Sequence, residues 1–365
     1  MAQQTFDHIK KSSPAFFLGA NSGKGFVNHF SECYRPEKGE KLYIIKGGPG
    51  TGKSTFMKEL IVTMKKHNVD CELYFCSSDP QSLDGVRFPS LGVALVDGTS
   101  PHSMDPQMLG IGEEIINLGE FLHSEELNRE EVVPLYRQNG AFHKKASRYL
   151  GAASRLMEDS YGISCNGCDF NKVEQTAMRF CREFFTDKKR RGEEYKRFLS
   201  AFTPKGHLLF EDTLARYADT IVAVEDEYGG VSSVFLTAIY NQALANGYEV
   251  LVCLCAMSPE RKIDHVIVPE LQLAFCTTNW FMPLTVDTSR RIHARRFYDM
   301  EYIAQYKHRL RFNRRASEEL LDGACQNLQE AKKVHDVLEE QYIKAMDFEG
   351  CNQVRQALEK KLLCQ

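Results

Sequence analysis

The chain has 365 residues, of which 43% are hydrophobic, 11% aromatic and 26% charged, an ordinary globular composition that excludes a chain dominated by disorder. Its formal charge of -3 at pH 7 gives no global reason to expect nucleic acid or an acidic membrane surface as a partner. It contains no apolar leader and no uninterrupted run of about 18 apolar residues, so we expect a cytoplasmic protein with no membrane contact.

The strongest motif follows an apolar strand expected at 42–45. The segment KGGPGTGKSTFMKEL has the G-x-x-x-x-G-K-S pattern of a phosphate-binding loop, or P-loop, and leads into an amphipathic helix. Such a loop points backbone N–H groups at phosphate oxygens, and the helix dipole adds to the attraction. Lys53 is expected to reach the β- and γ-phosphates of ATP, and Ser54 to bind Mg²⁺. The predicted nucleotide-binding residues are Gly47, Gly48, Pro49, Gly50, Thr51, Gly52, Lys53, Ser54 and Thr55.

Two further strands, at 72–76 and 93–96, are expected beside the P-loop strand. The second ends in Asp97, which fits the acidic Walker B residue that holds Mg²⁺ in P-loop proteins. The polar loop between these strands carries Asp79 and Asp84, and either carboxylate could orient the nucleophile. Asp79 precedes a proline, which is equally typical of a turn. The predicted catalytic residues are Lys53, Asp97, Asp79 and Asp84, and the predicted metal ligands are Ser54 and Asp97.

The chain contains an internal duplication. A shift of about 180 residues places FLSAFTPKG on FLGANSGKG, and TIVAVEDEYGGVSSVFL on the P-loop segment. The substitutions between the copies are Gly47 to Asp226, Gly52 to Val231, Lys53 to Ser232 and Asp97 to Thr277. Loss of the lysine and gain of carboxylates both disfavour a bound Mg-nucleotide. We therefore predict one working site and one decayed copy.

These patterns predict an α/β fold with two tandem P-loop-like repeats, each followed by a long helical region. We expect about four strands per repeat, few enough to favour close packing of the halves as a pseudo-dimer. The predicted boundaries are 1–103 for the active core, 104–197 for its helical region, 198–288 for the degenerate repeat and 289–365 for the C-terminal helical region.

Two basic runs, at 187–197 and 289–315, are typical of solvated helix faces, because acidic residues and tyrosines are interleaved with the cations. They also leave open a nucleic-acid contact, or an arginine that reaches the γ-phosphate from the second half. The candidates for that arginine are Arg290, Arg291, Arg295 and Arg296.

The segments KGGPGTGKSTFMKEL, SSDPQSLDGVRFPSLGVALVDGTSPH and VIVPEL resemble a family of bacterial tandem P-loop ATPase or nucleotide-kinase-like proteins, seen mostly in Firmicutes. The resemblance covers nearly the whole chain and implies ATP binding at residues 47–55 and at Asp97. Many members of that family carry a P-loop in each half. The second half of this chain departs from that pattern at the lysine and at the Walker aspartate.

The expected function is Mg²⁺-dependent binding and hydrolysis of ATP in the first half. The alternative enzyme is a nucleotide or small-molecule kinase, whose helical region would act as a lid. The alternative outside enzymology is an ATP-dependent switch or scaffold that grips a protein or nucleic acid. The acceptor or macromolecular partner stays unspecified, and self-association into a homo-oligomer stays open.

Overall fold

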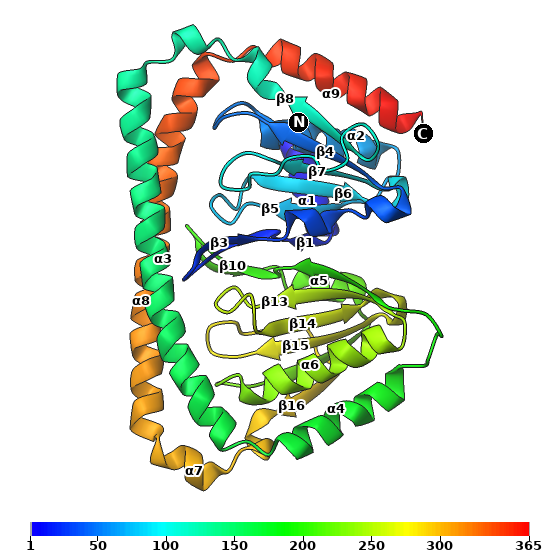
Figure 1. Cartoon of the computed structure of the whole chain (residues 1–365), viewed down its shortest axis with the longest axis vertical. Coiled ribbons are helices and arrows are strands. Elements are labelled where there is room, and N and C mark those ends of the chain that lie inside the picture. The colour runs from blue at the N-terminus through cyan, green and yellow to red at the C-terminus, as the bar shows by residue number, and fades with distance from the viewer. Residues whose placement is uncertain (1, 365) are drawn as a thin grey trace.

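The computed structural model describes residues 2–364 and shows two α/β bodies joined by a pair of long helices (Figure 1). The first body contains a six-stranded sheet in the order β1-β5-β6-β7-β4-β8, in which β6 alone runs antiparallel to its neighbours. Its strands are β1 (Ala15–Phe16), β4 (Lys41–Lys46), β5 (Glu72–Phe75), β6 (Leu83–Phe88), β7 (Val93–Asp97) and β8 (Glu113–Asn117).

The second body repeats this topology in a six-stranded sheet of order β9-β13-β14-β15-β12-β16, again with one antiparallel strand, β14. The pairing of β5 with β6 shifts register after Tyr74. The pairing of β13 with β14 shifts register after Cys253, the equivalent residue of the second repeat. The tandem α/β arrangement is confirmed, but each repeat has a separate sheet of six strands, more than the four expected. The strands are β9 (Glu193–Arg197), β12 (Thr220–Glu225), β13 (Glu249–Leu254), β14 (Ile263–Val268), β15 (Leu273–Thr278) and β16 (Arg290–His293).

Both central parallel strands, β4 and β12, are continuous apolar runs because helices or other elements cover each face of the sheet. After each strand comes the expected helix, α2 (Lys53–Lys66) or α6 (Gly230–Ala245). Both helices end before a left-handed residue, Asn68 with φ 60° or Gly247 with φ 85°. The buried stripes are equivalent: Phe56, Met57, Leu60 and Ile61 in α2, and Phe235, Leu236 and Ile239 in α6.

Smaller elements fill the space between and beside the sheets. Two hairpins, β2–β3 and β10–β11, lie where the bodies meet. These elements are α1 (Ala2–Ser12), β2 (Gly19–Ser22), β3 (Gly25–Asn28), β10 (Ser200–Thr203), β11 (Gly206–Leu209) and α5 (Asp212–Tyr217). The 3₁₀ turns are Phe30–Cys33, Pro36–Lys38, Pro89–Leu91, Leu118–Phe121, Ser124–Glu126, Pro269–Leu271 and Ala294–Phe297.

The two repeats meet through equivalent residues. Phe17 and Phe198 occupy the same position in the two copies, and each donates its N–H to the carbonyl of the other, at 2.8 and 2.9 Å. A reciprocal bond between equivalent residues places a pseudo-two-fold axis at this point. The chain is therefore built like a dimer whose two subunits are joined covalently.

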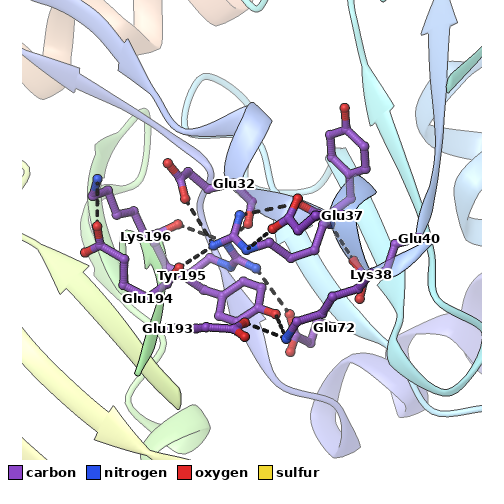
Figure 2. A network of polar contacts seen from close by, with 12 residues as sticks. Glu32, Glu37, Lys38, Glu40, Glu72, Glu193, Glu194, Tyr195 and Lys196 are labelled. Carbon is purple, nitrogen blue, oxygen red and sulfur yellow. Dashed lines mark hydrogen bonds and ion pairs between the residues drawn. The ribbon is translucent and has the colours of Figure 1, made fainter. Parts of the chain in front are cut away.

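A buried ionic network also connects the bodies (Figure 2). Arg197 of β9 is fully buried; its guanidinium lies 3.7 Å from the Glu72 carboxylate of β5 and donates to the Glu32 carbonyl at 2.9 Å. Arg87 approaches Glu72 to 3.8 Å. Burial would raise the pKa of Glu72, but Arg197 and Arg87 outweigh it and hold that pKa below its ordinary value. Opposite charges from the two repeats, Arg197 and Glu72, are therefore paired in a buried environment.

Two antiparallel helices of 38 residues, α3 (Arg129–Asn166) and α8 (Lys307–Lys344), run side by side along the whole molecule (Figure 1). We call them the arms. Each arm leads to a helix that covers the opposite repeat: α4 (Phe170–Phe184) packs on α6, and α9 (Phe348–Leu363) packs on α2. The short helix α7 (Met300–Gln305) precedes α8. Each repeat is therefore completed by a helix from the other half of the chain.

The regions expected to be helical contain strands as well. Residues 104–197 include β8, an edge of the first sheet, and β9, an edge of the second. Residues 289–365 include β16. A strand of four or five residues between long helical stretches has too little periodicity to be recognised in a single sequence. Within residues 2–364, no helix is both long and apolar enough to cross a bilayer.

Candidate functional site

The P-loop connects the carboxyl end of β4 to the first turn of α2. Gly50 and Gly52 have left-handed backbones with φ of 68° and 85°, a conformation that side chains disfavour. The buried Thr51 hydroxyl donates to the Gly48 carbonyl at 2.8 Å and closes the loop. Residues 47–52 therefore form a tight turn that opens at the N-terminus of a helix, the usual geometry of an anion site.

Lys53 and Asp97 lie together at the base of this loop. The Lys53 ammonium donates to the carbonyls of Gly47 and Gly48 at 2.9 and 2.7 Å, and lies 3.6 Å from the Asp97 carboxylate. Asp97 reaches this place because β7 runs parallel to β4, with Asp97 opposite Ile45. Two distant predicted residues thus meet at the edge of one sheet, as parallel strands require.

Ser54 stands in the first turn of α2, where its hydroxyl oxygen accepts the Leu83 N–H at 3.0 Å. It borders a cavity of about 1070 Å³ between the first repeat and the arms. The cavity wall includes Asp79, Asp84 and Asp97, together with every predicted nucleotide-binding residue except Gly47. Gly47 contributes through its carbonyl, which also accepts the Thr99 hydroxyl at 2.8 Å.

Asp79 is held by the turn in which it lies. Its carboxylate accepts the Gln81 N–H at 3.1 Å and the Ser82 hydroxyl at 2.8 Å, and Lys332 of α8 lies 3.4 Å away. Burial would raise the pKa of Asp79, but Lys332 and Ser82 outweigh it and lower that pKa. The Asp79 carboxylate is therefore bound both by groups of its own turn and by Lys332 of the arm α8.

Asp84 has a different environment. It is buried, and one carboxylate oxygen lies 3.4 Å from Nε2 of His102. Burial, helped by the nearby Asp97, raises the pKa of Asp84 against the opposing charge of His102. Cys76 completes a group of three donors, all within 4.8 Å of one another, of the kind that can hold a metal ion.

The arm α8 lies across the P-loop and supplies residues that the sequence did not indicate. A Cβ added to Gly50 would lie 2.6 Å from the Glu339 carbonyl oxygen, and one added to Gly48 would lie 2.8 Å from the Tyr342 ring. The other arm borders the cavity as well. The wall residues from the arms include Tyr136, Asn139, His143, Lys144, Arg148, Lys332, His335 and Glu339. The arms contain related segments, FHKKAS at 142–147 and FNRRAS at 312–317, but this similarity does not show that the arms return to the loop.

The corresponding loop of the second repeat is filled from within. Asp226 is 1% exposed, and its carboxylate accepts N–H groups from Ser232 at 2.8 Å and Tyr228 at 3.2 Å. It also accepts the Tyr298 hydroxyl at 2.8 Å. That hydroxyl accepts the Val231 N–H at 3.2 Å. The donors that would bind phosphate are already paired with a carboxylate and a hydroxyl of the same chain.

The arginines predicted as candidates for a γ-phosphate contact belong to the second repeat. Arg290 binds Glu183, with one contact of 2.8 Å, and Arg291 donates to the Thr288 hydroxyl at 3.0 Å. Arg295 borders a different cavity, and Arg296 follows it in the same 3₁₀ turn. None of the four borders the P-loop cavity. Within residues 2–364, the four arginines therefore lie away from the P-loop, because β16 runs along the far edge of the second sheet.

Comparison with known proteins gives a match over part of the chain. Residues 22–87 match the family model of the N-terminal region of nephrocystin 3, a region associated with P-loop NTPases. The matched segment contains Lys53, Asp79 and Asp84, and ends before Asp97. No curated protein and no solved structure matches the chain. The two equivalent sheets form an α/β protein of tandem repeats, and the comparison indicates an NTPase-associated domain in the first repeat.

Proposed function

We propose that this protein binds and hydrolyses ATP with Mg²⁺ at the P-loop of the first repeat, once per chain. The observation that carries the proposal is the pair formed by Lys53 and Asp97, 3.6 Å apart, at the base of a glycine-rich loop that borders a large cavity. A lysine for phosphate and a carboxylate for magnesium are the two charged groups that P-loop catalysis requires.

The residues present fit this ligand. The Lys53 ammonium is paired mainly with backbone carbonyls, so it can exchange these bonds for stronger ones to phosphate oxygens. Ser54 and Asp97 would hold the magnesium, since the Ser54 hydroxyl and the Asp97 carboxylate each keep acceptor capacity beyond their present bonds. Magnesium, when bound, neutralises negative charge on the phosphates.

The remaining steps fall to the protein itself. The loop N–H groups and Lys53 stabilise charge that develops on the transferred phosphoryl group. We assign the orientation of the attacking water to Asp84, which is buried beside His102, and leave Asp79 the role of anchoring α8 through Lys332. The arms cover part of the cavity, and closer contact of the arms with a bound nucleotide would exclude water and strengthen these electrostatic interactions.

A switch is the second candidate function, and one contact favours it. The Glu339 carbonyl of α8 lies against Gly50, so phosphates that enter the loop would meet the arm directly. Binding of ATP could therefore shift an arm that also reaches the second repeat. A kinase stays an alternative because the cavity, at about 1070 Å³, is large enough for an acceptor beside a nucleotide.

The proposed location is the cytoplasm, where ATP and Mg²⁺ are available. All twelve cysteines of the chain are free thiols, and those in the strands behave as small apolar residues. Such a cysteine content is typical of a reducing compartment.

Phosphate release by the purified chain, with ATP and with or without Mg²⁺, tests the function. We expect Mg²⁺-dependent release that needs no acceptor. Release that appears only with a nucleoside or metabolite would favour the kinase. Stoichiometric ATP binding without turnover would favour the switch. Equal ATP binding by the wild type and Lys53→Ala would contradict all three.

A further inference from the structure

The second repeat has a cavity of its own. It measures about 590 Å³ and lies between the decayed loop and the arms, in the position equivalent to the P-loop cavity. The C-terminal part of α3 and the N-terminal part of α8 border it, whereas the other ends of the arms border the first cavity. Decay of the loop has therefore not closed the space beside it.

Basic side chains dominate the charge of this cavity. Six basic and three acidic residues border it. The acidic groups are already engaged: Glu227 lies 3.5 Å from Arg314, Glu158 lies 3.9 Å from Arg261, and Asp226 is bound to its own loop. Among residues 2–364, no ion pair within 4.0 Å involves the cavity residues Arg295, Lys307 and Arg311. The cavity thus presents positive charge with no matching anion.

One of the cations is buried at the cavity wall. The Lys262 side chain is only 16% exposed, and its ammonium lies 3.0 Å from the Asp264 carboxylate. Burial would lower the pKa of Lys262, but Asp264 outweighs it and raises that pKa. Position 262 corresponds to Ser82 in the first repeat, because Ile263 aligns with Leu83. The second repeat has lost the P-loop lysine but carries a different lysine beside the same cavity.

Apolar and aromatic surfaces form the rest of the wall. Trp280 and Phe281 follow β15, and their rings pack edge to face at 5.1 Å. The Arg314 guanidinium lies 5.4 Å from the centroid of the Trp280 ring. A flat ring system could stack on such a surface while an attached anion reaches the basic side chains.

We propose that this cavity is a second small-molecule site, which binds an aromatic compound bearing a phosphate or carboxylate group. The anion would be held by Arg311, Arg295 and Lys262, and not by the loop N–H groups, because Asp226 already pairs with those groups. The aromatic part would lie against Trp280 and Phe281. This site does not depend on hydrolysis in the first repeat.

Trp280 is the one tryptophan in the chain and borders this cavity, so its fluorescence reports on binding there. The probes are AMP and phenyl phosphate, with adenosine as the uncharged control and inorganic phosphate as the anion without a ring. We expect a saturable change in emission with either probe, and much weaker binding of adenosine and of phosphate. Calorimetry of the wild type measures the binding if the emission does not respond.

Variants decide whether the binding occurs in this cavity. Loss of a charge-assisted contact in Arg311→Ala should weaken binding about ten-fold or more. The matched control is Arg315→Ala, an exposed residue of the same helix outside the cavity. Lys53→Ala should leave the Trp280 response intact, which separates this site from the P-loop.

The proposal is overturned if neither probe gives an emission change or heat of binding at millimolar concentration. It is also overturned if adenosine binds as tightly as AMP, or if Arg311→Ala binds both probes like the wild type. A response that disappears in Lys53→Ala would assign the binding to the first repeat instead.

Discussion

The two loops at equivalent positions differ in the side chain that occupies them. In the first repeat, the loop borders the large cavity and its lysine folds back onto the carbonyls of Gly47 and Gly48. In the second, the carboxylate of Asp226 occupies the equivalent place and binds the N–H of Ser232. The strand and the helix are the same in both. A loop of this geometry can therefore be filled by a carboxylate of its own chain while the fold around it stays intact.

The largest expected effect concerns the buried ion pair between the two repeats, formed by Arg197 and Glu72. Arg197→Met leaves Glu72 buried without its main counter-charge, so the free energy of unfolding should fall by about 3–5 kcal/mol. Denaturant unfolding measures this. Lys196→Met, the adjacent control, removes a partly exposed pair and should cost less than about 1 kcal/mol. Equal losses in the two variants would show that the buried network does not stabilise the contact between repeats.

The next effect separates the two loops by function. Lys53→Ala should lower the rate of phosphate release by about 10²–10³-fold, because the charge on the transferred group loses its stabilising cation. The counterpart change, Ser232→Ala, should leave this rate unaltered. Steady-state phosphate release with both variants gives the answer. A comparable loss in Ser232→Ala would place nucleotide chemistry in the second repeat as well.

The internal anion can be removed. Asp226→Ala leaves the Ser232 N–H, the Tyr228 N–H and the Tyr298 hydroxyl without their acceptor, so the free energy of unfolding should fall by about 2–3 kcal/mol. ATP should still bind once per chain, because Ser232 and Thr277 stand where the first repeat has Lys53 and Asp97, and Lys262 beside the loop is paired with Asp264. Denaturant unfolding and equilibrium dialysis measure the two quantities, with the exposed Glu227→Ala as control. Binding of a second ATP would contradict the comparison of the loops.

The smallest effect is a dependence on pH. The pKa of Glu72 lies below its ordinary value of 4.5 in the folded chain, so its contribution to stability is complete above about pH 4.5. It is lost as the pH falls through the folded pKa, because protonation removes the charge that Arg197 and Arg87 bind. Unfolding free energies between about pH 5 and pH 3 should therefore fall more steeply for the wild type than for Glu72→Gln. Equal pH dependence of the unfolding free energy in the two proteins would argue against a contribution of the Glu72 charge to stability.

Several features of the fold follow from local patterns. The apolar runs of β4 and β12 and the stripes of α2 and α6 repeat at a fixed offset, so the tandem α/β arrangement could be predicted. The number of strands could not, because β1 has two residues and β16 has four. Pairing with neighbours defines such short strands, and their own periodicity does not.

The residues of the candidate site could be predicted only in part. A P-loop binds through its own backbone and the next helix, so Gly47 to Thr55 are adjacent in sequence as well as in space. Asp97 could be predicted because strand ends of a parallel sheet share one edge. Asp79 and Asp84 could not be ranked, because their environments depend on Lys332 and His102.

The sequence by itself determined the two repeats, the open loop in one and the loss of lysine in the other. Only the tertiary structure decided that the arms cross to the opposite repeat, that α8 lies on the P-loop, and that Asp226 fills the second loop. The physical reason is the range of the interactions. Loop and strand preferences act between neighbours along the chain, whereas the arms are placed by burial of surfaces more than a hundred residues apart.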